Sequence, residues 1–121
     1  MAAKKVLVVD DSTVQRNNLA QIIEDAGFVV VKAESGKQSI ESAVNEQPDL
    51  IFMDIIMPEM DGYEACRHLT RRDDTKHIPV VFVTTKDQKA DQVWAKMQGG
   101  KGFVVKPYSE DEITDQLKSY L

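Results

Sequence analysis

The chain has 121 residues, of which 42% are hydrophobic and 29% charged, a composition that suits one globular domain with a single core. Its formal net charge of −5 argues against unspecific affinity for nucleic acid or anionic lipid. Cys66 is the only cysteine and no apolar stretch approaches membrane-spanning length, so we expect a cytoplasmic domain over residues 1–121 with no internal disulfide and no membrane segment.

Five short apolar runs alternate with segments whose apolar residues recur at helical spacing. The runs predict strands over residues 6–9, 28–31, 50–53, 78–83 and 103–105. Four of the helices begin at a capping residue that has a glutamine or glutamate three positions later: Ser12, Ser35, Asp61 and Ser109. The helix between the last two strands carries an apolar stripe made of Ala90, Val93, Trp94 and Met97. This stripe predicts that Trp94 belongs to the core.

Alternating strands and helices predict a parallel sheet with helices on both faces. We expect a doubly wound α/β fold of the flavodoxin-like kind, with five strands in the order 2-1-3-4-5 and a functional crevice at their carboxyl ends. Polar residues follow four of the strands: Asp10 and Asp11 the first, Asp54 the third, Thr84 the fourth and Lys106 the fifth. The sequence therefore predicts one site at this edge of the sheet.

The residue types at this edge indicate phosphoryl chemistry. Three neighbouring carboxylates repel one another, and a hard divalent cation such as Mg²⁺, or Mn²⁺ in its place, would remove the conflict. Two acids would then serve as metal ligands and the third as a nucleophile that forms an acyl phosphate. The ammonium group of Lys106 and the hydroxyl group of Thr84 would contact the phosphoryl oxygens.

Several stretches resemble the receiver domain of bacterial response regulators: residues 8–12, 53–54, 57–58, 61–62, 84 and 106–107. The match follows the whole chain in order, so the chain resembles a stand-alone, CheY-like receiver without an output domain. The resemblance implies a monomeric signalling protein, not an enzyme, in which Asp54 accepts phosphate from a histidine kinase. The phosphorylated form would then bind a downstream target protein.

The resemblance also assigns roles to individual residues. It implies that Mg²⁺ is held by Asp10, Asp11, Asp54 and the backbone carbonyl group of Ile56. The residues that contact phosphate or form the switch would be Thr84, Lys106 and Phe103, with Thr85 as a further candidate. Pro107 would follow a cis peptide bond, and the output face would include Lys89, Lys96, Phe103 and Tyr108. Within the family, residues 83–88, 93–94 and 98–99 are similar to the single-domain receivers of type IV pilus (twitching motility) chemosensory systems.

Two other classes of function use similar residues. A phosphatase of the haloacid dehalogenase type combines an aspartate nucleophile, Mg²⁺, threonine and lysine on a parallel sheet. It places the nucleophile after its first strand in an Asp-x-Asp pattern, whereas here Asp10, Asp11 and Ser12 follow that strand. The second alternative is a degenerate receiver that binds its partner constitutively, which the complete set of site residues argues against. Turnover of a small phosphate ester would favour the phosphatase, and failure to incorporate phosphate would favour the degenerate receiver.

Overall fold

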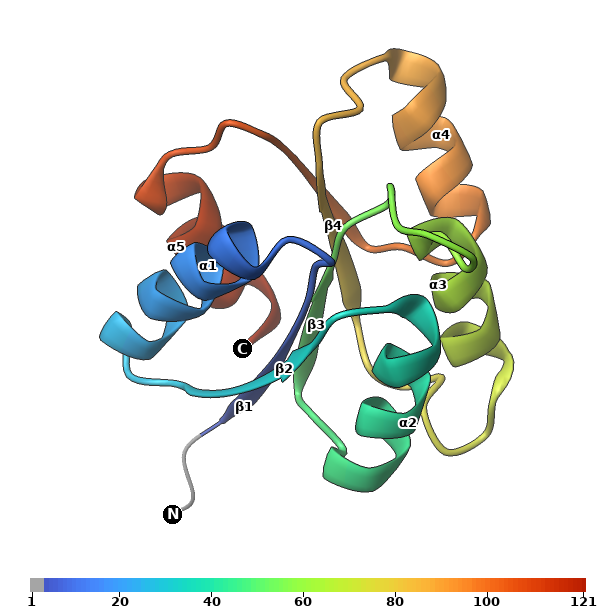
Figure 1. Ribbon diagram of the computed structural model, residues 1–121, viewed down its shortest axis with the longest axis horizontal. Helices are drawn as coiled ribbons and strands as arrows, with labels where there is room; N and C mark the ends of the chain where they lie inside the picture. The colour runs from blue at the N-terminus through green and yellow to red at the C-terminus, as the bar shows by residue number, and fades with distance from the viewer. Residues whose placement is uncertain (1–3) are drawn as a thin grey trace.

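The computed structural model describes residues 4–121, so the first three residues of the predicted 1–121 domain lie outside it. Five strands and five helices alternate along these residues, as predicted (Figure 1). The strands are β1 (Lys5–Val9), β2 (Val29–Ala33), β3 (Leu50–Met53), β4 (Val80–Thr84) and β5 (Gly102–Val105). The helices are α1 (Thr13–Asp25), α2 (Gly36–Glu46), α3 (Gly62–Arg71), α4 (Lys89–Met97) and α5 (Glu110–Tyr120).

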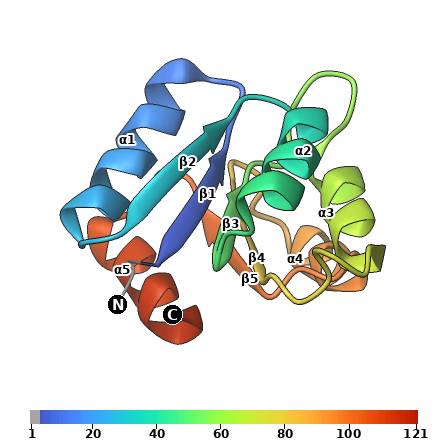
Figure 2. The same cartoon turned by 90° about the horizontal axis from the view of Figure 1, so that it is seen from below.

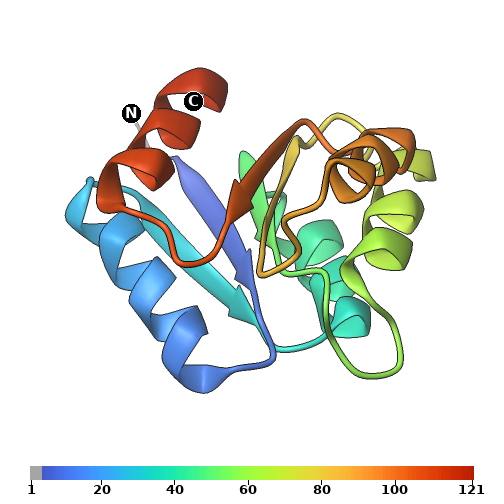
Figure 3. The same ribbon diagram turned by 90° about the horizontal axis from the view of Figure 1, so that it is seen from above.

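The strands form one parallel sheet in the order β2-β1-β3-β4-β5, which confirms the predicted topology. Helices α1 and α5 cover one face of the sheet and α2, α3 and α4 cover the other (Figures 2 and 3). β2 lies on one side of β1, and after α2 the chain crosses to the other side of β1 to form β3. The carboxyl ends of β1 and β3 therefore meet at the topological switch point, where doubly wound sheets bind their ligands.

Two apolar layers fill the space between the sheet and its helices. Leu7 and Phe82 belong to the layer under α2, α3 and α4, whereas Val8 and Phe52 belong to the layer under α1 and α5. Every residue of β3 and β4 is buried, because both strands are central and covered on both faces. This burial explains their continuous apolar runs and holds the carboxyl ends of both strands rigidly. Among the helices of residues 4–121, none has both the length and the apolar character needed to cross a membrane.

Two strands begin later than the apolar runs predict. Phe28 belongs to the turn that follows α1 instead of starting β2: Gly27 has φ of 98°, and the N–H group of Phe28 donates to the carbonyl oxygen of Ile23 at 3.3 Å. β4 begins after Pro79, which has no N–H group for the strand ladder, although its carbonyl oxygen accepts the N–H group of Ile51 at 3.0 Å. In both cases local backbone chemistry delays the start of the strand.

The prediction that Trp94 belongs to the core is wrong. The apolar stripe on α4 exists, but it faces solvent: Val93, Trp94 and Met97 are 53%, 46% and 69% exposed. The buried residues are instead Ala95 of α4 and Gln98, which caps the carboxyl end of the helix; they are 3% and 7% exposed. Helical periodicity identified the stripe correctly but could not tell which side of the helix meets the sheet.

Candidate functional site

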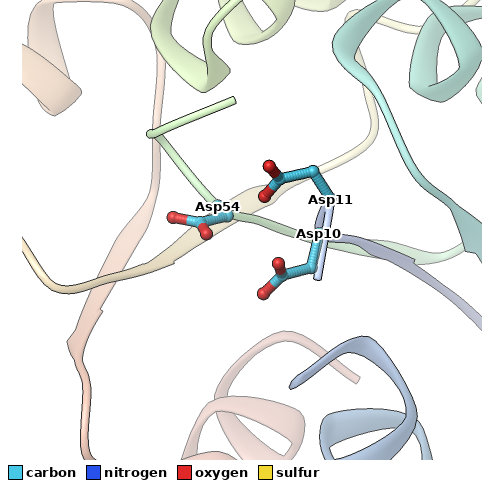
Figure 4. Close-up of side chains that lie close together, drawn as sticks. All are labelled: Asp10, Asp11 and Asp54. Atoms are coloured by element: carbon cyan, nitrogen blue, oxygen red, sulfur yellow. The ribbon is translucent and has the colours of Figure 1, made fainter. Parts of the chain in front are cut away.

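Three carboxylates meet at the carboxyl edge of the sheet, as predicted (Figure 4). Asp10 and Asp11 follow β1, Asp54 follows β3, and one oxygen of each lies within 4.8 Å of the others. Backbone hydrogen bonds between neighbouring strands continue into the acids. The N–H group of Asp54 donates to the carbonyl oxygen of Val9 at 3.0 Å, and that of Asp10 donates to the carbonyl oxygen of Ala33 at 3.2 Å. Asp10 and Asp54 are buried and Asp11 is exposed. Two acids are thus fixed by the sheet and the third lies at its rim.

This cluster fits a hard divalent cation. Its donors are all carboxylate oxygens, which Mg²⁺ prefers, and the exposed Asp11 leaves one side open for water ligands. Across residues 4–121, it is the only group of three or more histidine, cysteine or acidic side chains close enough to share an ion. The chemistry of the donor set therefore agrees with the predicted metal.

The turn between β1 and α1 orients the carboxylate of Asp10. Its Oδ1 accepts the N–H group of Ser12 at 2.9 Å, while its backbone carbonyl oxygen accepts Nη1 of Arg16 at 2.9 Å. Ser12 caps α1 by accepting the N–H group of Gln15 at 3.3 Å. Because these contacts occupy one carboxylate oxygen, Oδ2 of Asp10 is the oxygen that remains for the centre of the site.

The carboxylate of Asp54 is held in the same way. Its Oδ1 accepts the N–H group of Ile55 at 2.7 Å and that of Ile56 at 3.4 Å. The loop then folds back so closely that a Cβ atom on Gly62 would lie 2.1 Å from the carbonyl oxygen of Asp54. Only glycine allows this approach, which places α3 directly behind the acid. Ile56 lies at the rim with its side chain 54% exposed.

Lys106 reaches into the cluster from the end of β5. Its Nζ donates to Oδ2 of Asp10 at 2.8 Å and to Oδ2 of Asp54 at 3.2 Å, and it also contacts Oε1 of Gln15. The peptide bond between Lys106 and Pro107 is cis, as the resemblance implied. The structure thus joins residues from the first and last strands around one ammonium group.

Burial and charge shift the pKa values of this pair. Burial raises the pKa of Asp54; the ammonium of Lys106 lowers it and the charge of Asp10 raises it, with a raised value as the result. Burial alone would lower the pKa of Lys106, but its hydrogen bond to Asp10 and the two negative charges outweigh burial and raise it. Lys106 is therefore a cation at neutral pH. Any further cation at the site would stabilise the ionised form of Asp54.

The proposed switch residues lie on β4, the following loop and β5. Thr84 is fully buried, and its hydroxyl oxygen accepts the N–H group of Lys86 at 3.3 Å. Thr85 is exposed. Phe103 is half-buried, with its ring centroid 6.5 Å from that of Phe82. The threonine nearest the sheet edge and the aromatic residue of β5 therefore both contact the core.

The four residues predicted for the output face lie on α4, on β5 and in the loop after β5. Lys89 and Lys96 are exposed on α4, and Lys96 shares a hollow of about 200 Å³ with Phe103. Tyr108 packs instead against the layer under α1 and α5 and lines a different groove, of about 660 Å³, together with residues of α1. Lys96 and Phe103 thus line one hollow and Tyr108 lines another.

Two residues near the site are absent from the predicted set. The capping pattern places Gln15 at the start of a helix, but its side chain contacts Lys106 instead of returning to the cap. The guanidinium group of Arg16 holds the turn that carries Asp10. A positional signal was available, because both residues lie in the first turn of a helix that starts directly after the two acids.

Known proteins share this sequence and fold. A family model for the response regulator receiver domain matches residues 6–118. Protein PilH of Pseudomonas aeruginosa is 40% identical over 117 residues, which cover 97% of this chain and 97% of PilH. The crystal structure of chemotaxis protein CheY4 of Vibrio cholerae has a TM-score of 0.93 and 30% identity, and the match covers 99% of this chain and 100% of CheY4.

A third similar structure contains a metal ion. The receiver domain of a sensor histidine kinase from Pseudomonas aeruginosa has a TM-score of 0.90 and 24% identity, with 98% of each chain covered, and its structure has a magnesium ion coordinated in the active-site cleft. At this identity the likeness shows a common fold alone. The family match over residues 6–118 and the likeness to PilH go further, and they establish that this chain belongs to the family of response regulator receiver domains.

Proposed function

We propose that Asp54 accepts a phosphoryl group from a histidine kinase and that the phosphorylated chain signals by binding a second protein. The observation that carries the proposal is the position of Asp54: a buried carboxylate at the switch point, with Lys106 at 3.2 Å and two further acids beside it. A structural acid at the end of a strand would not need a lysine from β5 and two acids from β1. Phosphoryl transfer needs both, to balance charge as it develops.

The two carboxylate oxygens of Asp54 have different contacts and would have different roles. Oδ1 is held by two backbone N–H groups, whereas Oδ2 faces the site and Lys106. Oδ2 would attack phosphorus as the P–N bond of phosphohistidine breaks and the imidazole leaves with the electron pair. The ammonium of Lys106 would then follow the negative charge onto the phosphoryl oxygens. The hydroxyl group of Thr84 would donate to one of these oxygens.

We further propose that Mg²⁺ binds to Asp10, Asp11, Asp54 and the backbone carbonyl group of Ile56, with Mn²⁺ as a substitute. The support is the all-oxygen cluster and the magnesium in the receiver domain of the sensor histidine kinase. When bound, the ion would neutralise the carboxylates and the incoming phosphoryl group. The three acids would hold it, and the exposed Asp11 would be the ligand nearest solvent.

The output would be phosphorylation-dependent binding by a monomer in the cytoplasm. Movement of Thr84 toward the phosphoryl group would allow the Phe103 ring to shift, which alters the surface that it shares with Lys96. The sequence resemblance to receivers of type IV pilus chemosensory systems, together with the identity to PilH, favours a chemosensory pathway of that kind. Proteins of the family act in signalling, and we propose that this chain catalyses only its own phosphorylation and dephosphorylation.

The experiment is to incubate the chain with acetyl phosphate, with and without Mg²⁺, and to record its intact mass. The wild-type chain should gain one labile phosphoryl group only with Mg²⁺, and Asp54→Asn should gain none. Asp115→Asn, an exposed acid on α5, is the matched control and should behave as wild type. Equal incorporation by Asp54→Asn would contradict the assignment of Asp54. No incorporation by the wild-type chain would favour the constitutive binding module instead.

A further inference from the structure

The outward side of α4 exposes more large apolar surface than any other described element. Val93, Trp94 and Met97 are 53%, 46% and 69% exposed, and their spacing places them side by side on the helix. Other large apolar residues with comparable exposure occur singly, on α1, on β2 and in the loop after β3: Val14, Val29 and Ile56. A gathered apolar patch with a polar border is typical of a protein interaction site.

A hollow of about 250 Å³ adjoins this patch on the side of α3. It is lined by Asp61, Tyr63, Glu64, Arg67 and Trp94. The rings of Tyr63 and Trp94 meet edge to face, with centroids 6.4 Å apart and an interplanar angle of 87°. Figures 1 and 3 show α3 and α4 side by side at the end of the molecule. The hollow is therefore an aromatic corner between two helices, bordered by charged side chains.

The charged border of the hollow favours a cation. Arg67 donates Nη1 to Oε1 of Gln98 at 3.0 Å and forms an ion pair with Glu64 at 4.0 Å, which is too long for a hydrogen bond. With Asp61 and Glu64 against Arg67, the lining has one net negative charge. Asp61 uses Oδ1 to accept the N–H group of Glu64 at 2.9 Å, and its other oxygen remains for a ligand. Two carboxylates beside an indole and a phenol ring suit a guanidinium or ammonium group, which binds both to acids and to aromatic rings.

We propose that this patch and hollow together dock an amphipathic helix of a partner protein. Its apolar residues would cover Val93 and Met97, and an arginine or lysine beside them would lie against Trp94 and reach Asp61 and Glu64. This surface differs from the proposed output surface, because Lys96 and Phe103 share a hollow on the β5 side of α4 whereas Trp94 lines the hollow on the α3 side. The proposal does not depend on phosphorylation of Asp54.

A second copy of the chain fits this surface less well. The apolar patch lies on one helix of nine residues, and its three partly exposed side chains provide far less than the roughly 800 Å² per partner that a stable protein interface buries. A single docked helix needs less area, and its arginine or lysine supplies the charge that complements the acids of α3.

The test uses three synthetic helical peptides with the same apolar stripe, flanked by arginine, glutamine or glutamate. Trp94 is the only tryptophan, so its fluorescence reports binding directly, and amide NMR shifts locate the peptide. The arginine peptide should bind saturably, with shifts in α4 and the first turns of α3, and should bind about tenfold tighter than the glutamate peptide. The glutamine peptide should lie between them.

Variants of the chain separate the two parts of the surface. Met97→Asp should weaken the arginine peptide about tenfold or more, whereas Val14→Asp, at an equally exposed position on α1, should not. Glu64→Gln should reduce the preference for arginine over glutamine, whereas Glu41→Gln on α2 should leave it unchanged. None of the four substitutions changes the carboxylate cluster, so all four variants should still accept phosphate.

Four results would overturn the proposal. The first is equal affinity for the arginine and glutamate peptides, and the second is a set of shifts outside α3 and α4. The third is no saturable change with any peptide. The fourth is a concentration-dependent dimer of the free chain, detected by sedimentation, that Met97→Asp abolishes; it would assign the patch to a second copy.

Discussion

Replacement of Lys106 by methionine is the sharpest perturbation of the site. The Lys106 ammonium lies 2.8 Å from Asp10 and 3.2 Å from Asp54, and the three side chains are only 12%, 6% and 11% exposed. Removing one partner of a buried ion pair destabilises a protein by about 3–5 kcal/mol, because the other charge stays buried. One side of this site is open, so we expect the lower end, about 3 kcal/mol. For a chain of this length that corresponds to a melting temperature roughly 10 °C lower.

The loss should depend on pH with a definite sign. The charge of Lys106 lowers the pKa of Asp54, so its removal leaves burial and Asp10 to raise that pKa further. An acid whose folded-state pKa lies above its unfolded value of about 3.9 favours folding when protonated, and that stability is lost as pH rises through the folded pKa. The stability gap between wild type and Lys106→Met should therefore narrow as pH falls from about 7 to about 5.

Thermal melts by circular dichroism, with and without Mg²⁺, measure these effects. Mg²⁺ should raise the melting temperature of Lys106→Met more than that of the wild type, because in the variant the ion has no ammonium to displace and supplies the missing charge. Lys118→Met, on the exposed side of α5, is the matched control and should have the same melting temperature as the wild type. The electrostatic account of the site is wrong if Lys106→Met has the same melting temperature as this control. It is also wrong if Mg²⁺ increases the difference in melting temperature between Lys106→Met and the wild type.

Three further predictions follow from other contacts. Without Mg²⁺, Asp11→Ala should be as stable as the wild type or more stable, since it removes an exposed like charge. Asp10→Ala should be less stable, because it removes the two hydrogen bonds that the Asp10 side chain accepts. In both variants Mg²⁺ should raise the melting temperature less than it does in the wild type. Gly62→Ala should lower the free energy of unfolding by about 2 kcal/mol or more in denaturant titrations, because its Cβ would lie 2.1 Å from the carbonyl oxygen of Asp54. Burial raises the pKa of Cys66 to about 12, so the native chain should resist maleimide near pH 8 and react when unfolded; rapid native labelling would refute this.

The fold could be predicted from the sequence because its local signals agree with one another. The side chains of Ser12, Ser35, Asp61 and Ser109 all accept the N–H group three residues later, as their patterns predicted. The fully apolar runs of β3 and β4 correspond to central strands covered on both faces. Parallel strands bring their carboxyl ends to one edge whatever the side-chain details, so the meeting of the three acids followed from the strand pattern alone.

Features that depend on tertiary packing could not be predicted. Periodicity placed Trp94 on an apolar stripe, yet the side of α4 that meets the core is set by Ala95, whose small size lets the helix approach the sheet. Gln15 fits a capping pattern, but a lysine 91 residues later in the sequence competes for its side chain. The position of Gln15 beside the two acids can be read from the sequence, but the distant residue that it contacts cannot.

The most direct test of the central claim is to locate the phosphoryl group. The chain is phosphorylated with acetyl phosphate and Mg²⁺ and then reduced with borohydride, which converts an aspartyl phosphate to homoserine. Peptide mass spectrometry identifies the reduced position. We predict homoserine at position 54 alone, and none in a sample prepared without Mg²⁺. Homoserine at position 10 or 11, or a chain that carries phosphate with position 54 unreduced, would contradict the account.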